Sequence, residues 1–295
     1  MIIEIKYPVK INYNPESDKP SRVFTSLGKT IDTFYKLDTI LANSIGDKIQ
    51  VKQTLDHIEL GSITTWLKSL IEIPDDDSLR AKKYNEKKVK EYFDKSRNQI
   101  LSKYEGDYDL ESAETYQKVE REVRQIAEET GILNEFTWNS PEALRVAEVF
   151  DDLSKSFSLL NETDEVQIGE QSRKIMMPKG KVINLVQMQE SLVHHKNTND
   201  TKEKLIIKKA DFLGESKWDF RVGNRRVEAK IVDENWMRLL HNREIRLTTG
   251  DSLLVILRTE LGFDKNRRLV TEKHEIIKVL KLENSSDMLQ DNLPL

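Results

Sequence analysis

The sequence predicts an α+β protein made of a small N-terminal sheet with packed helices and a small C-terminal β-barrel. Three observations support this fold class. The chain has 295 residues, which at about 150 residues per domain suggests two domains. Apolar and polar side chains alternate at its start, and helical spacing of apolar residues follows through its middle. Further along, short strand patterns separated by turn residues replace the helical spacing.

The composition limits the classes of protein to consider. Charged residues make up 33% of the chain and hydrophobic residues 37%, which is polar for a globular protein but not a disordered composition. The chain has no cysteine, which excludes disulfides, cysteine-ligated zinc, iron–sulfur clusters and a cysteine nucleophile. No apolar run approaches the ~20 residues of a membrane span, and the start lacks a signal-peptide pattern. We therefore expect a cytoplasmic protein without a membrane partner.

The N-terminal sheet is expected to begin with the most regular strand pattern of the chain. Residues 3–13 alternate between apolar and polar side chains without a break, which predicts a half-buried strand. Pro8 lies on the polar side, and its missing amide donor indicates an edge strand. Residues 49–53 and 57–63 fit further strands, whereas residues 63–73 fit a helix or a buried strand equally well.

Amphipathic helices are expected between and after these strands. The first has apolar residues three and four apart and ends at Gly46, a residue type that commonly terminates helices. Ser140 and Pro141 suit the N-cap and first turn of a later helix. The expected helices span 21–45, 79–104, 109–130, 141–160 and 182–193, with a short hairpin at 164–177.

The C-terminal part has the element order of a small barrel. A polar stretch without periodicity, 194–203, is expected to link the domains 1–193 and 204–283, and residues 284–295 to form a flexible tail. Three strand patterns, a short helix capped by Asp233 and two more strand patterns follow the linker. This order is that of an OB-type barrel of five strands and one helix. The expected strands are 205–209, 217–222, 226–231, 253–258 and 270–282.

Charge is distributed unevenly between the two expected domains. The whole chain has a net charge of −4. Residues 202–283 hold 19 Lys and Arg against 14 Asp and Glu, a surplus of +5, whereas residues 1–201 hold 28 against 35. A surplus of this size is modest, so by itself it gives little support for a nucleic-acid partner.

Common catalytic and cofactor motifs are incomplete in this chain. The segment 26–30 ends like a phosphate-binding loop, but Val23 stands where that loop requires glycine. The five histidines lack the spacing of a helical metal pair, and no GxSxG motif is present. These motifs therefore predict no cofactor.

Two carboxylates are expected to face each other in the C-terminal domain. Gly223-Asn224 suits a two-residue hairpin turn, which places Asp219 directly opposite Glu228. Lys230 lies two residues further along the same face. Facing carboxylates are unfavourable unless a cation lies between them. We therefore expect either a divalent metal ion held by Asp219 and Glu228 or an ion pair with a basic side chain.

This arrangement resembles the PD-(D/E)xK nuclease family, in which an acidic residue on one strand precedes Glu-x-Lys on the next. The resemblance covers a short part of the chain, and Trp218 stands where the family has proline. It implies that Asp219 and Glu228 hold Mg²⁺ or Mn²⁺ and that Lys230 orients the attacking water, with Glu190 as a further ligand.

The same hairpin has two other interpretations. Arg221 and Arg226 lie on the face of the two acids, where they can pair with them and form an ordinary solvent-exposed surface. Alternatively, the barrel binds single-stranded nucleic acid, with Arg221, Arg225 and Arg226 on the phosphates. The register disfavours this, because two of the three aromatic residues that would stack on bases lie on the opposite face. The three are Trp218, Phe220 and Trp236.

A second group of motifs spans most of the chain and consists of strand and turn patterns rather than catalytic ones. The motifs are Asp56-His57-Ile58-Glu59-Leu60-Gly61-Ser62, Trp218-Asp219-Phe220, Ala229-Lys230-Ile231-Val232-Asp233, Trp236, Gly250-Asp251-Ser252-Leu253 and Glu275-Ile276-Ile277-Lys278-Val279. This group is similar to uncharacterised bacterial proteins of mobile and phage-defence regions. The resemblance implies a bacterial defence setting and no particular reaction.

Together these observations predict a non-enzymatic adaptor or sensor subunit of a bacterial complex, with phage defence as the implied setting. Such a subunit would act by binding another protein or nucleic acid, without a cofactor. The alternative is a Mg²⁺- or Mn²⁺-dependent nuclease of the PD-(D/E)xK type that uses Asp219, Glu228 and Lys230.

Overall fold

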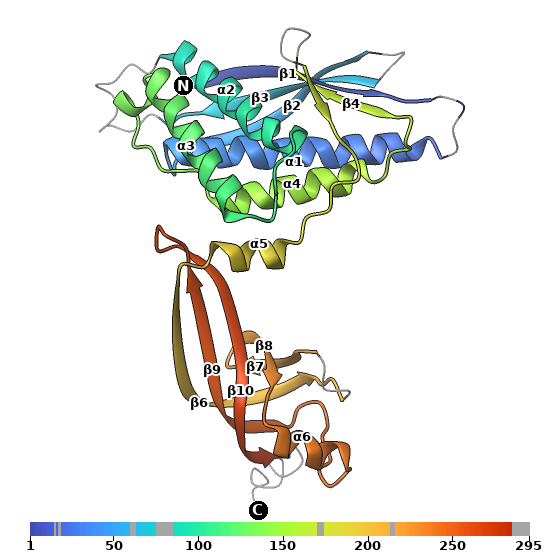
Figure 1. Ribbon diagram of the computed structural model, residues 1–295, viewed down its shortest axis with the longest axis vertical. Helices are drawn as coiled ribbons and strands as arrows, with labels where there is room; N and C mark the ends of the chain where they lie inside the picture. Colours follow the sequence, from blue (N-terminus) through green and yellow to red (C-terminus); the bar gives the residue numbers. More distant parts are fainter. Residues whose placement is uncertain are drawn as a thin grey trace, which may run out of the picture. The chain divides into compact units, whose positions relative to one another are not determined.

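The protein has the mixed α+β architecture that its sequence predicts, with a closed barrel in its C-terminal region (Figure 1). The structure, a computed structural model, divides into two compact units, Met1–Ser191 and Leu192–Leu295. Parts of several expected elements lie outside the described residues, including 60–62, 79–84 and 285–295. The described residues are 1–14, 16, 19–59, 63–74, 85–169, 174–212 and 216–284.

The N-terminal unit is built on an antiparallel sheet of five strands in the order β2-β3-β1-β4-β5. Residues 63–73 fitted a helix or a strand, and 63–72 of them form β3. The expected hairpin at 164–177 is present as the pair β4 and β5. The strands are β1 (Ile2–Asn12), β2 (Gln50–Glu59), β3 (Ile63–Glu72), β4 (Glu165–Ile168) and β5 (Ile175–Met177).

Strand β1 lies in the middle of this sheet, so the prediction that Pro8 marks an edge strand is wrong. The proline is tolerated because pairing between β1 and β4 runs only from Val9 to Asn12. Pro8 therefore sits at the end of the β4 ladder, where its carbonyl accepts a hydrogen bond from the amide of Gly169 (3.0 Å). No ladder hydrogen bond in the interior of the sheet has to be given up.

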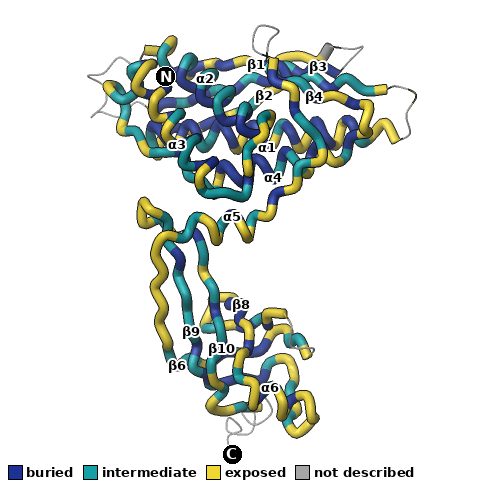
Figure 2. Tube along the Cα trace, in the orientation of Figure 1, coloured by how far each residue is buried: buried dark blue, intermediate teal, exposed yellow. Residues whose placement is uncertain are grey.

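Helices cover one face of the sheet and leave the other open (Figures 1 and 2). The odd-numbered residues of β1 from Ile3 to Ile11 are buried, and most of the even-numbered ones are exposed or half-buried. Helices α1 and α2 contact the sheet, while α4 packs on α1 and α3 on α2. The helices of this unit are α1 (Ser21–Ile45), α2 (Glu86–Glu105), α3 (Ala113–Glu129), the 3-10 turn η1 (Ile132–Asn134), α4 (Ala143–Phe157) and α5 (Leu185–Leu192).

A buried ion pair joins the first two helices to the sheet. The Arg97 guanidinium on α2 donates from Nε and Nη2 to Oδ1 of Asp38 on α1, at 3.1 and 2.8 Å. The other carboxylate oxygen of Asp38 accepts hydrogen bonds from Tyr7 and Ser69, one on β1 and one on β3. Burial raises the pKa of the Tyr7 hydroxyl well above its usual value, so Tyr7 stays neutral and donates.

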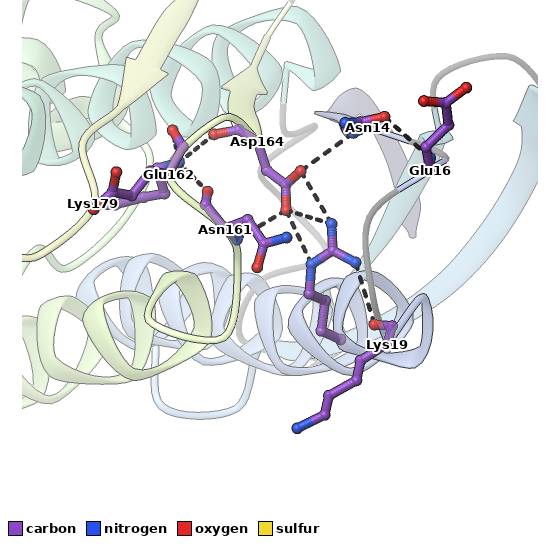
Figure 3. Close-up of polar contacts among 8 residues, drawn as sticks. Asn14, Glu16, Lys19, Asn161, Glu162, Asp164 and Lys179 are labelled. Carbon is purple, nitrogen blue, oxygen red and sulfur yellow. Dashed lines mark hydrogen bonds and ion pairs between the residues drawn. The ribbon is translucent and has the colours of Figure 1, made fainter.

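A second polar cluster joins the start of α1 to the loop that precedes β4 (Figure 3). The buried Asp164 carboxylate accepts hydrogen bonds from the Arg22 guanidinium on α1 and from the backbone amides of Asn14 and Asn161. Lys179 donates to three backbone carbonyls of the segment 161–164. These bonds fix the start of α1 and the chain after β5 to the loop between α4 and β4.

The C-terminal unit is a closed barrel with the strand order β10-β8-β7-β6-β9. Strands β8 and β10 pair in parallel and the other neighbours are antiparallel. With the helix between the third and fourth strands, this is the OB-type order that the sequence predicts. The elements are β6 (His195–Lys209), β7 (Trp218–Val222), β8 (Arg225–Ile231), α6 (Glu234–His241), β9 (Ser252–Phe263) and β10 (Leu269–Glu283).

Three strands of the barrel continue beyond it as an arm, defined here as residues 195–200, 258–263 and 269–274 (Figure 1). The prediction of a linker over 194–203 is therefore wrong, since all but the first of these residues lie in β6. Residues 195–200 are exposed, so the alternating apolar pattern that reveals a strand is missing. Cross-strand pairs stabilise the arm instead, with Lys196 on Glu260 at 2.9 Å and Arg258 bidentate on Asp200 at 2.8 Å.

Candidate functional site: the outer face of the β7–β8 hairpin

The hairpin between β7 and β8 has the register that the sequence predicts. Gly223 has a φ of +56°, which suits the first central position of a two-residue hairpin turn. Val222 consequently pairs with Arg225, and Asp219 lies directly opposite Glu228. The two carboxylates, separated by nine positions in the sequence, therefore share the outer face of the barrel.

The inner face of the hairpin belongs to the hydrophobic core. Trp218 and Phe220 are 1% and 0% exposed, and the ring of Trp236 on α6 lies 6.0 Å from that of Trp218. These aromatic side chains pack against other core residues, so none of the three offers a free surface on which a nucleic-acid base could stack. The hairpin can present only its polar side chains to a partner.

Arg226 is the cation that the facing carboxylates require. Its guanidinium donates to both oxygens of Asp219, at 2.8 and 2.9 Å, and to Oε1 of Glu228 at 2.9 Å. These hydrogen bonds to Asp219, and the negative charges of both acids, raise the pKa of Arg226 above its usual value. The ion-pair interpretation of this face is thus the arrangement present in the structure.

The residues of the nuclease resemblance are only partly brought together. Asp219, Glu228 and Lys230 lie on one face, with Lys230 exposed and in register with Glu275 of β10. Glu190 lies in α5, within the other unit. Across the residues that the structure describes, no group of three or more His, Asp or Glu side chains is arranged to hold a metal ion. A divalent ion between Asp219 and Glu228 would have to displace the Arg226 guanidinium.

The hairpin carries more positive than negative charge at the end where its turn lies. Arg221 lies directly opposite Arg226, and Arg225 follows the turn. Both Arg221 and Arg225 are exposed, and neither forms an ion pair within the described part of the chain. Like charges opposite each other are unfavourable. The two acids on Arg226 reduce that cost, and Arg221 and Arg225 remain as surplus cations.

The sequence did not indicate a second polar cluster, which lies on the open face of the N-terminal sheet. Asp56, at a bulge in β2, accepts a bidentate hydrogen bond from Lys6 at 3.0 Å and lies 3.5 Å from the Lys68 ammonium. The neighbouring His57 ring stacks on Trp66 at 5.6 Å. The hydrogen bond from Lys6, followed by that from His57, lowers the pKa of Asp56 to about 2. Pairing across three strands creates this cluster, and no local sequence pattern reveals it.

The fold and the hairpin define an α+β protein with an OB-type barrel that displays arginine side chains on its outer face. No family model, curated protein or solved structure matches the chain. Among the described helices, none combines the length and apolar character needed to cross a membrane.

Proposed function

We propose that this protein is a non-enzymatic binding protein, an adaptor or sensor subunit that acts through the outer face of its barrel. The observation that supports this most strongly is the surplus of arginine on the β7–β8 hairpin. Arg226 balances the two acids, and Arg221 and Arg225 are left exposed beside the turn. The hairpin therefore offers positive charge to a partner.

The charge chemistry favours nucleic acid as that partner. Guanidinium groups match phosphate geometry and bind it through paired hydrogen bonds. The outer positions of the fully described strands β7 and β8 hold no aromatic side chain. Binding would thus rely on backbone phosphates, and its affinity would fall with salt and depend little on base sequence. OB-type barrels often bind oligonucleotides on their second and third strands, which is support by analogy of fold alone.

The same proposal includes a protein partner, because an adaptor subunit also binds the other proteins of its complex. The strand and turn motifs resemble those of bacterial proteins in mobile and phage-defence regions, and that setting is the one we propose. An adaptor of this kind would recruit nucleic acid to the complex.

The proposal is tested by removing the surplus charge from the hairpin. The double variant Arg221→Glu/Arg225→Glu should bind a fluorescein-labelled 20-nucleotide DNA, single-stranded or duplex, about tenfold more weakly than wild type in low salt. The matched control, Arg124→Glu/Arg145→Glu, makes the same charge change at exposed positions of α3 and α4. It should bind within about twofold of wild type. Equal affinity of the hairpin variant and the control, measured by fluorescence anisotropy, would contradict the proposal.

A metal-dependent nuclease is the second candidate function, because Asp219 faces Glu228 and Lys230 lies on the same face. On this alternative, Mg²⁺ or Mn²⁺ displaces Arg226, and the wild type cleaves labelled DNA or RNA. Glu228→Gln and Lys230→Ala would then abolish cleavage, while Arg226→Ala would retain or increase it. We expect no cleavage by any of these proteins on a denaturing gel. Cleavage with that dependence on Glu228 and Lys230 would replace the binding proposal.

A further inference from the structure

The turn at the end of the arm, Asp264–Arg268, is a basic and largely exposed turn of the barrel unit. It holds Lys265, Arg267 and Arg268 against the single acid Asp264. Lys265 and Arg267 are exposed, and Arg268 is half-buried. The turn projects from the end of the three-stranded arm (Figure 1). A compact cluster of positive charge is therefore presented at the tip of an extended element.

The one carboxylate of the turn is used to shape its backbone. Oδ1 of Asp264 accepts hydrogen bonds from the amides of Asn266 and Arg268, both at 2.8 Å. The amide of Asp264 donates to the carbonyl of Arg268 at 2.9 Å, and the amide of Arg267 donates to the carbonyl of Asp264 at 3.0 Å. Four hydrogen bonds within five residues fix the backbone of this turn. The positions from which its basic side chains extend are therefore set before a ligand binds.

Arg267 occupies a backbone conformation that glycine or asparagine would adopt more easily. Its φ is +62°, in the left-handed region, which is unfavourable for a long side chain. Arg267 forms no ion pair among the described residues. The exposed side chain extends from this position into solvent. Its guanidinium is thus available to a ligand.

The base of the turn is held tightly. Gly262 packs so closely that a Cβ atom would overlap Oγ1 of Thr271 and lie 2.9 Å from Cγ2 of Val193. The amide of His194 donates to the carbonyl of Phe263 at 2.8 Å. The chain entering β6 is therefore fixed against the end of the β9–β10 hairpin. This contact keeps the turn at a constant place on the arm.

We propose that the turn 264–268 is a preorganised phosphate-binding site for the backbone of nucleic acid, separate from the β7–β8 hairpin. The proposal rests on the proposed function and adds a second contact to it. A lipid surface is the less suitable partner, because the apex of the turn, Lys265-Asn266-Arg267, has no apolar side chain to enter a bilayer and the exposed Leu269 lies at the base of the turn. Arginine and lysine on a rigid turn suit phosphates that follow one another along a strand.

The test compares two exposed arginines that have the same φ angle. Arg243, which follows α6, is also exposed and has a φ of +62°. In anisotropy titrations of the full chain with a labelled 20-base-pair DNA duplex, Arg267→Ala should weaken binding about fivefold at low salt. It should also reduce the magnitude of the slope of log affinity against log salt by about 1, which corresponds to the loss of one phosphate contact. Arg243→Ala should leave affinity and slope unchanged, and Arg267→Lys should retain the wild-type slope.

The outcomes separate this inference from the proposed function. If Arg267→Ala binds as wild type while Arg221→Glu/Arg225→Glu binds weakly, the turn makes no phosphate contact and the inference is overturned alone. Absence of binding by the wild type overturns both. Flotation of the wild type, but not of Arg267→Ala, with phosphatidylserine vesicles and without DNA binding would make the turn a membrane contact and overturn the inference.

Discussion

Three carboxylates of this protein, Asp38, Asp56 and Asp219, each accept hydrogen bonds from a cation, and their burial decides what each contact does. The pair between Asp38 and Arg97 is almost fully buried, so losing one partner leaves a charge in an apolar interior. The pair between Asp219 and Arg226 is exposed on the Arg226 side, so it adds little to the free energy of unfolding. Its effect is on the charge of the outer face.

Removing the buried cation should destabilise the N-terminal unit strongly. Arg97→Met leaves Asp38 buried without its partner, and we expect the free energy of unfolding to fall by about 3–5 kcal/mol. Urea denaturation followed by circular dichroism measures this. Asp38→Leu/Arg97→Met should recover much of the loss, and Arg124→Met on the surface should cost less than about 0.5 kcal/mol. A loss below about 1 kcal/mol in Arg97→Met would show that the pair is not buried as described.

The lowered pKa of Asp56 gives the unfolding transition a specific pH dependence. Its folded pKa of about 2 is below the unfolded value, so its contribution is present above the unfolded value and is lost as the pH falls towards 2. In Asp56→Asn, the thermal midpoint should therefore fall less than in wild type between pH 5 and pH 2. An NMR titration of the Asp56 carboxyl should also give a higher midpoint in Lys6→Met. Two results would contradict this explanation of the pH dependence. One is an identical fall of the thermal midpoint in wild type and Asp56→Asn, and the other is an NMR titration midpoint that Lys6→Met leaves unchanged.

Whole elements were predictable from sequence where one face is buried and the other exposed. The hairpin register follows from Gly223-Asn224 and from the alternation in Trp218–Val222, and it placed Asp219 opposite Glu228 correctly. The first strand of the arm, 195–200, was missed because both of its faces are exposed and polar and it therefore has no period, whereas residues 270–274 fell within the expected strand 270–282. The choice of Arg226 as the bridging cation depends on a side-chain rotamer, which no sequence pattern specifies.

The arm should depend on the close packing at Gly262. A Cβ atom there would overlap Oγ1 of Thr271, so we expect Gly262→Ala to destabilise the C-terminal unit by about 1–3 kcal/mol. Thr271→Ala in the same chain should relieve part of that loss by removing the hydroxyl. Gly28→Ala on α1 is the control, because no atom lies within 4 Å of its Cβ position. Equal unfolding midpoints for Gly262→Ala and wild type in a thermal melt would show that this packing is loose.

At the scale of the whole molecule, the order of strands and helices was accessible from the sequence, and the pairing between distant segments was not. Three strands, a helix and two strands predicted the OB-type order, because each strand alternates in its own right. The central place of β1 in its sheet follows from pairing with β3 and β4, which lie far along the chain. The Asp56 cluster depends on such pairing, because its members come from β1, β2 and β3, and it was therefore invisible to local patterns.

The most direct test of the central claim is to ask whether the full chain binds nucleic acid and leaves it intact. A labelled DNA duplex is incubated with the protein in Mg²⁺ or Mn²⁺ at several salt concentrations, then run on a native gel and, after denaturation, on a sequencing gel. We expect a shifted band that weakens steeply as salt increases and an oligonucleotide recovered at full length. No shift at low salt, or cleavage that disappears in Glu228→Gln, would contradict it.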